Sequence, residues 1–291
     1  MPLYILSFDI EDWFHIFHPA YENNPELWEK LSGRVEENTG WVLDFLSKHH
    51  LKATFFCLGW VAEKYPTLIK TIHREGHEVA AHSFLHNKVK NLGPESFYAD
   101  TKRVINILEE ITGNKVISYR APGFSMDKTT HWAFEILHGL GIENDSSFKS
   151  GMYMGFPKKI PNEPFILKGE GFSIREFPTR TFNLLGSHQI YSGSGYFRLY
   201  PYHFVKKMFK SSDYEMAYFH PRDFDNHIHK YLNGHLLVSL RYRIGTNRSR
   251  SNIDQFVTDF EFRTLQNAIE IFDWNNAKIY DLLNGDNNQA G

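Results

Sequence analysis

The sequence predicts an α/β protein built on a parallel sheet or barrel, and three observations lead to this fold class. Short apolar segments with the composition of buried strands alternate with amphipathic helical segments up to about residue 145. This alternation at close intervals predicts right-handed βαβ units. Polar side chains follow directly after several of the apolar segments, and chemistry in such folds gathers at the C-terminal ends of the strands.

The elements before residue 145 are expected to alternate along the chain. Residues 4–8 form a short apolar run with strand composition. An aromatic loop over 14–33 follows, which is long enough to be functional rather than a mere connector. The next element is an amphipathic helix over 35–50. The remaining expected elements are strands at 52–58, 77–81 and 116–119 and helices at 66–76, 96–112 and 129–140.

From about residue 150 to residue 200 the alternation breaks up, because Gly and Pro become frequent. Segments such as 172–178 are expected to be short strands of an irregular β excursion. Residues 186–200 are expected to form a flexible, polar and aromatic loop. That loop either faces a substrate or is a plain surface loop.

The last part of the chain is expected to be mainly helical. A helix at 202–210 leads to a last strand at 215–219, and helical stretches beyond residue 225 include 252–271. Since no linker, repeat or low-complexity segment divides the chain, we expect a single domain over 1–291.

Composition and charge exclude several classes of protein. The net charge is −2, which argues against a nucleic-acid binder, and the basic run at 241–250 is interpreted as a solvated surface. The one cysteine, Cys57, cannot form an intrachain disulfide. No signal-peptide pattern and no apolar run of ~20 residues is present, so no membrane span and a cytoplasmic location are predicted.

An acidic cluster follows the first predicted strand. Asp9, Glu11 and Asp12 lie within four positions, and such charges need a positive partner if they are buried. His82 and His86, four residues apart after the third strand, would face one side of a helical turn. Together these residues suggest a divalent metal site.

Three further strand ends carry candidate site residues. Arg120 could pair with a carboxylate, and the turn at Gly123 and Phe124 could direct backbone N–H groups at an oxyanion; a plain turn with a surface salt bridge is the alternative. His220 is either a core histidine or a general acid. Asp145 could hydrogen-bond to this imidazole and set its tautomer.

In this order the motifs resemble those of the NodB-homology polysaccharide deacetylases (carbohydrate esterase family 4). The resemblance runs from about residue 4 to residue 224, and the tail at 225–291 looks like the C-terminal extension of a subgroup found in bacterial surface-polysaccharide loci. It implies a deformed, incomplete (β/α) barrel of about seven strands. The motifs that carry it are Asp9 with Glu11/Asp12, His82-Ser83-x-x-His86, Arg120-x-Pro122-Gly123-Phe124, Asp145-x-Ser147 and Phe219-His220.

The resemblance also implies roles for these residues. The implied cofactor is one divalent metal ion, Zn²⁺ before Co²⁺ or Ni²⁺, held by a carboxylate and two histidines. Ile10 replaces the second of two adjacent aspartates in the usual first motif, so the carboxylate ligand is either Glu11 or Asp12. Alternation along an extended segment favours Glu11, because it points the same way as Asp9. The remaining implied assignments are Asp9 as general base, His82 and His86 as ligands, Arg120 as the residue that orients Asp9, His220 as general acid, Asp145 as the residue that tunes His220, and Gly123, Phe124 and the loop residue Tyr196 as oxyanion or substrate contacts.

The function implied is metal-dependent removal of N-acetyl groups from an amino sugar in a bacterial surface polysaccharide or its precursor. An N-acetylated sugar, an oligosaccharide and a lipid-linked glycan are all possible substrates, and the oligomeric state is open. A non-sugar C–N hydrolase of the same fold is one alternative. A carbohydrate-binding protein without turnover and a domain with a structural metal are two others, although a structural zinc normally has four protein ligands and only three are found here.

Overall fold

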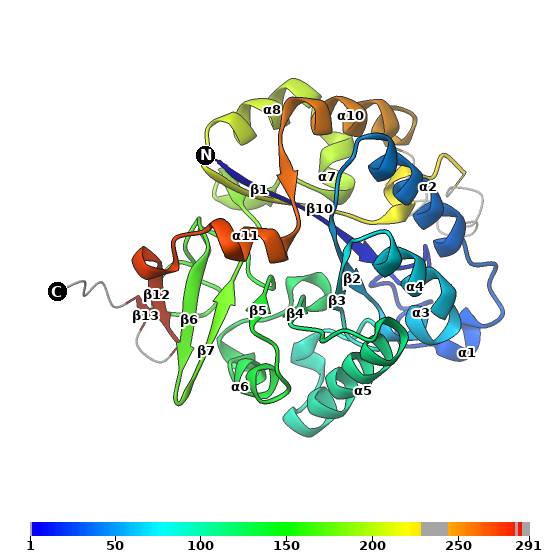
Figure 1. Cartoon of the computed structure of the whole chain (residues 1–291). Coiled ribbons are helices and arrows are strands. Elements are labelled where there is room, and N and C mark those ends of the chain that lie inside the picture. The colour runs from blue at the N-terminus through cyan, green and yellow to red at the C-terminus, as the bar shows by residue number, and fades with distance from the viewer. Residues whose placement is uncertain (1, 228–243, 283–284, 287–291) are drawn as a thin grey trace.

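The computed structural model describes residues 2–227, 244–282 and 285–286, and in this part of the chain one large sheet forms the centre of the molecule (Figure 1). Its strands are β1 (Leu3–Ile10), β2 (Thr54–Cys57), β3 (Glu78–Ala81), β4 (Ser118–Tyr119), β5 (Asn144–Asp145), β6 (Phe165–Gly169), β7 (Phe172–Glu176), β10 (Tyr214–Phe219), β11 (Phe262–Arg263), β12 (Lys278–Asp281) and β13 (Gly285–Asp286).

Seven neighbouring strands of this sheet are parallel, in the order β10-β1-β2-β3-β4-β5-β7. Next to β7 the order continues with β6, β12 and β13, of which β6 and β13 are each antiparallel to the strand before them. The order has two separate ends, so the described strands do not close into a barrel. The predicted α/β class is confirmed, with a mixed but mostly parallel sheet. An incomplete barrel of about seven strands was predicted, and β6, β11, β12 and β13 extend the sheet beyond the seven parallel neighbours.

Helices cover this sheet and fill the connections between its strands. They are α1 (Pro25–Trp28), α2 (Val35–Lys48), α3 (Gly59–Lys64), α4 (Pro66–Arg74), α5 (Pro94–Thr112), α6 (Trp132–Gly139), α7 (Ser194–Leu199), α8 (Tyr202–Lys210), α10 (Thr246–Asp259) and α11 (Leu265–Ile271). Short 3-10 turns are η1 (Val89–Asn91), η2 (Pro122–Phe124), η3 (Lys128–Thr130), η4 (Pro221–Phe224) and η6 (Trp274–Asn276). No helix in the described ranges has the length and apolar character needed to cross a membrane.

Strand β1 explains how the sheet positions polar groups. All eight of its residues are buried, and the period of two sends alternate side chains to opposite faces. Leu6 and Phe8 join the main core, whereas Leu3 and Ile5 join the smaller core that α11 covers. By this alternation Asp9 points to the same face of β1 as Leu3 and Ile5. Its carboxylate therefore faces the inner side of the curved sheet.

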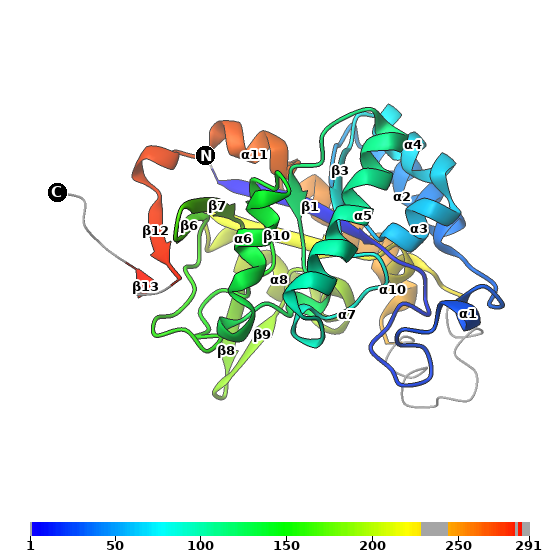
Figure 2. The same ribbon diagram turned by 90° about the horizontal axis from the view of Figure 1, so that it is seen from below.

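Two segments differ from the sequence prediction. The predicted loop at 186–200 contains strand β9 (Ser187–Ile190), which pairs with β8 (Thr181–Leu184) in a hairpin, and helix α7. Figure 2 shows this hairpin projecting from the body of the molecule. The tail is helical in α10 and α11, but it also supplies β11, which pairs with β1, and β12, which pairs with β6. Of the basic run, residues 241–243 lie outside the described residues.

Candidate active site

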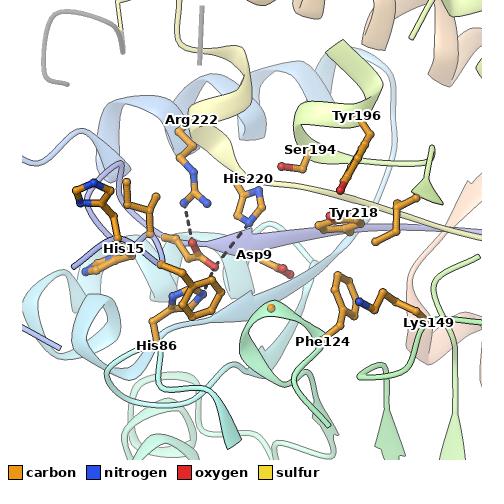
Figure 3. A pocket seen from close by; sticks show the side chains of 16 residues that line it. Asp9, His15, His86, Phe124, Lys149, Ser194, Tyr196, Tyr218, His220 and Arg222 are labelled. Carbon is orange, nitrogen blue, oxygen red and sulfur yellow. Dashed lines mark hydrogen bonds and ion pairs between the residues drawn. The ribbon is translucent and has the colours of Figure 1, made fainter. Parts of the chain in front are cut away.

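The predicted site residues come from the C-terminal ends of neighbouring parallel strands. Asp9 ends β1, His82 follows β3, Arg120 follows β4 and His220 follows β10. Because these strands are parallel, their ends lie at one edge of the sheet. A single pocket opens there, and its wall includes Asp9, Glu11, His86, Gly123, Phe124, Tyr196, Tyr218, His220 and Arg222 (Figure 3).

One carboxylate oxygen and two imidazoles converge beside this pocket, and two of these groups, Glu11 and His86, line it. Glu11 Oε1 lies 2.8 Å from His86 Nε2 and 3.2 Å from His82 Nε2, and all three side chains are buried. His82 Nδ1 lies 2.7 Å from the carbonyl oxygen of Arg120, to which it donates as N–H, so in the neutral ring Nε2 is the nitrogen with the lone pair that can bind a metal. One carboxylate and two imidazole nitrogens are a donor set that suits zinc, and three protein ligands leave a position open.

The second oxygen of Glu11 is held by an arginine that is not among the residues predicted from sequence. Arg222 Nη1 donates to Glu11 Oε2 at 2.6 Å and to the carbonyl oxygen of Asp12 at 3.1 Å. Burial raises the pKa of Glu11, but the charges of His86 and Arg222 outweigh this and lower it well below its usual value. Glu11 is therefore an ionised carboxylate with Oε1 turned toward the two histidines.

The Asp12 carboxylate has different partners from those of Glu11. Its oxygens accept the backbone N–H groups of Trp13 at 2.7 Å, Arg34 at 2.8 Å and Val35 at 3.1 Å. Val35 is the first residue of α2, so Asp12 satisfies N–H groups at the start of that helix. Among the described residues, the groups able to hold a metal ion include Glu11 but not Asp12.

Asp9 is held in place by Arg120. Arg120 Nη1 donates to Asp9 Oδ1 at 2.6 Å, and both side chains are buried. The guanidinium is itself fixed by Ser146, which accepts from Nη2 through its hydroxyl at 3.1 Å, and by the ring of Phe56 at 4.0 Å. The predicted orientation of Asp9 by Arg120 thus has a geometric basis.

His220 also lies near Glu11, and its two ring nitrogens face different carboxylates. Its Nε2 lies 3.7 Å from Glu11 Oε1, and its Nδ1 lies 3.3 Å from Asp223 Oδ2. Arg198 Nη2 lies 3.4 Å from the other oxygen of Asp223. Burial raises the pKa of Asp223, but the hydrogen bond to His220 and the charge of Arg198 outweigh it and lower the pKa to about 2. Neither Asp223 nor Arg198 is predicted from sequence.

The predicted pairing of Asp145 with His220 is wrong. Asp145 lies on β5, which four other strands separate from β10 in the sheet order. Its carboxylate accepts the Ser147 hydroxyl at 2.7 Å and the Ser147 N–H at 3.1 Å, and it also bonds to Glu176. Burial raises the pKa of both acids, and Asp145 raises that of Glu176 further, so Glu176 carries the proton between them. Asp145 therefore organises the loop after β5.

The remaining predicted contacts form the wall of the pocket. Gly123 has φ of 63° and a Cβ there would lie 2.6 Å from Phe17, whose ring also stacks on His86 at 4.6 Å. The Phe124 N–H donates to the carbonyl oxygen of Ala121 at 3.1 Å, whereas the Gly123 N–H has no recorded acceptor within the described residues. Tyr196 lines the opposite part of the pocket and belongs to a small apolar cluster with Phe124. The predicted aromatic loop at 14–33 thus contributes Phe17 directly to the site.

Two family models match consecutive parts of the chain. A family model described as polysaccharide deacetylase matches residues 23–142, and a model described as a domain of unknown function (DUF3473) matches residues 146–270. The expectation of a single domain over 1–291 stays a prediction.

Individual relatives match parts of the chain. The peptidoglycan-N-acetylglucosamine deacetylase of Bacillus cereus is 33% identical over 127 residues, which are 43% of this chain and 46% of that protein. The chitooligosaccharide deacetylase of Rhizobium leguminosarum bv. trifolii is 36% identical over 64 residues, which are 22% of this chain and 30% of that protein. The chain thus spans less than half the length of these relatives.

A solved structure is similar over most of the chain. A Mycobacterium smegmatis protein assigned to the polysaccharide deacetylases matches with a TM-score of 0.53 and 20% identity, over 90% of this chain and 93% of the other. This similarity shows a shared fold.

Proposed function

Because this chain belongs to the polysaccharide deacetylase family, with a DUF3473 region toward its C-terminus, we propose that it is a metal-dependent hydrolase that removes N-acetyl groups from an amino sugar of a bacterial surface polysaccharide or its precursor. The observation that supports this most is the convergence of the buried side chains of Glu11, His82 and His86 beside Asp9 and His220. This set combines metal ligands with a candidate base and a candidate acid.

Glu11, His82 and His86 would hold the metal, and His82 is already oriented for this through its Nδ1–H. A bound Zn²⁺, Co²⁺ or Ni²⁺ would polarise the acetyl carbonyl and lower the pKa of a water molecule toward ~7. Asp9 accepts a proton from the attacking water. Its bond to Arg120 keeps the receiving carboxylate in one orientation during that transfer.

The acetamide then has to release its amine. The Gly123 N–H at the pocket wall donates to the carbonyl oxygen as this atom gains negative charge. His220 delivers a proton from Nε2 to the leaving nitrogen, since Nδ1 is directed at Asp223. The proton prevents departure of an amide anion, so the products are acetate and a free amino sugar.

The test is acetate release from N-acetylated sugars and oligosaccharides by metal-stripped protein supplied again with Zn²⁺, Co²⁺ or Ni²⁺. Asp9→Asn is expected to lower the rate by at least a factor of roughly one hundred, as expected for a lost general base. Asp44→Asn, which changes an exposed aspartate of α2, is the matched control and is expected to keep the wild-type rate.

Other outcomes would redirect the assignment. Metal-dependent hydrolysis of cyclic or linear amides without any release from sugars would favour the non-sugar C–N hydrolase. Tight sugar binding with no hydrolysis under any metal would favour a carbohydrate-binding protein. Full activity of Asp9→Asn would remove Asp9 from the mechanism.

A further inference from the structure

Lys149 presents a charge in the pocket wall that the proposed hydrolysis does not use. It follows β5 by four residues, and its backbone is fixed by a bridge to Thr179. Its side chain is half-buried and lines the same pocket as the metal-site residues. Within the described ranges the structure records no hydrogen bond or ion pair for its amine, and burial lowers the pKa of Lys149. An amine withdrawn from water without a counter-charge costs free energy unless a partner arrives.

The other charged groups of the pocket are already compensated. Asp9 is paired with Arg120 at 2.6 Å and Glu11 with Arg222 at 2.6 Å. Asp223, behind His220, is paired with Arg198. Each of these three carboxylates is therefore paired with an arginine, and none of them is recorded in an ion pair with Lys149.

The pocket consequently has an excess of positive charge, which a divalent ion on Glu11, His82 and His86 would increase. A concave site of one sign and low dielectric attracts ligands of the other sign. In Figure 3 the Lys149 side chain lies beside Phe124, while His86 lies toward the other side of the view. Apolar surfaces of Phe124 and Tyr218 line the pocket as well and can cover a sugar ring.

We propose, building on the deacetylase function above, that the substrate is an acidic N-acetylated glycan whose anionic group is bound by Lys149. A lysine ammonium binds carboxylate or phosphate as a compact point charge, so the shared chemistry is an anion close to the sugar that carries the acetamide. A neutral N-acetyl sugar would leave the amine without a partner. The two sources of the anion are a uronic acid within a glycan and the phosphate of an activated or lipid-linked sugar.

A matched pair of substrates tests this proposal. N-acetylated chitotetraose and its C6-oxidised derivative differ only at C6, where a carboxylate replaces the neutral hydroxymethyl group, and UDP-N-acetylglucosamine supplies the phosphate alternative. Wild-type protein with metal bound is expected to prefer an acidic member, and the ratio of kcat/KM for acidic over neutral substrate is expected to fall roughly tenfold in Lys149→Met. Lys70→Met, an exposed lysine of α4, is the control and is expected to keep the ratio. The preference should also weaken with added salt.

Binding separates this proposal from the deacetylase function itself. Calorimetry on metal-loaded Asp9→Asn protein, with and without Lys149→Met, measures affinity for the same ligands without turnover. A preference for the acidic ligand that disappears with Lys149→Met supports the role of Lys149, whether or not acetate is released. An absence of acetate release would count only against the deacetylase function. Equal losses on neutral and acidic ligands, or an unchanged ratio, would overturn the role of Lys149.

Discussion

Glu11 and Asp12 are adjacent in sequence, yet their carboxylates serve different parts of the molecule. The extended end of β1 sends neighbouring side chains to opposite faces. Glu11 thereby reaches His82 and His86, whereas Asp12 turns toward the backbone before α2. Asp12, whose carboxylate accepts three backbone N–H groups, stabilises the fold. Glu11, whose carboxylate faces two imidazoles, is available to bind a cation.

Separate substitutions of these two residues are expected to affect different quantities. Glu11→Gln should lose tight Zn²⁺ binding, measured as metal content after dialysis, because an amide is a weaker ligand than a carboxylate. Asp12→Ala should retain one metal ion but lower the free energy of unfolding by about 1–3 kcal/mol, because buried N–H groups lose their acceptor. Loss of metal from Asp12→Ala with unchanged stability would instead identify Asp12 as the ligand.

Residues in local motifs could be predicted from sequence, whereas those that act through tertiary contacts could not. His82 and His86 share a four-residue spacing, and Asp9 follows a strand, so each carries a local signal. Arg198 and Arg222 carry none, because their partners lie far away along the chain. Asp223 did have a signal, since its position three residues after His220 allows the capping box that starts η4.

Helix α7 and the 3-10 turn η4 together hold His220, the proposed general acid, in position. Arg198 belongs to α7, within the region that the DUF3473 model matches, and Asp223 belongs to η4. Phe197 of α7 packs against Phe219, the residue before His220, with ring centroids 5.1 Å apart. The C-terminal region therefore helps to build the edge of the sheet that carries the candidate site instead of forming a separate appendage.

Substitution of either supporting residue is expected to slow catalysis. Asp223→Asn should lower kcat by roughly ten- to hundredfold, because His220 Nδ1 loses the carboxylate that orients the imidazole. Arg198→Met should produce a smaller loss, because it acts on His220 only through Asp223. Rates of acetate release by metal-loaded protein measure both changes, and urea unfolding of each variant checks that the fold is retained. An unchanged kcat in a folded Asp223→Asn variant would contradict this role of Asp223.

Element boundaries followed from sequence where periodicity was strong. Helix α8 coincides with its predicted range at 202–210, and α5 begins only two residues before its predicted start. In contrast, β9 and α7 are short and lie in a glycine-rich stretch where no periodicity can develop. Their structure depends on pairing with β8 and on packing against α10.

For the whole molecule, the strand–helix alternation was sufficient to predict the α/β class, while the way the tail completes the sheet was not. Strand β11 has two residues and β12 has four, too few for a pattern of alternation. Both exist because edges of β1 and β6 are available to them. The sheet also buries several carboxyl groups away from the site, and these link the stability of the fold to pH.

Glu215 of β10 is the clearest case, and its effect on stability can be predicted with its sign. Burial raises its pKa from 4.5 to about 8, although Tyr191 donates a hydrogen bond to it. Between these two values the folded state holds a proton that the unfolded chain has released. The stability that this proton contributes is thus complete below pH 4.5 and is lost as the pH rises toward about 8, at up to about 1.4 kcal/mol per pH unit.

Urea unfolding of wild type and Glu215→Gln at intervals from pH 5 to 8.5 gives the free energy of unfolding of each protein as a function of pH. The difference between the two curves measures the contribution of Glu215, because the contributions of the other buried acids are the same in both proteins. The free energy of unfolding of the variant should fall less steeply with pH, because glutamine keeps an acceptor for Tyr191 but cannot titrate. Glu135→Gln, an exposed glutamate of α6, should follow the wild-type curve. Parallel curves for wild type and Glu215→Gln would mean that Glu215 is ionised in the folded protein. Its negative charge would then be compensated by Arg180, whose Nε lies 3.8 Å away.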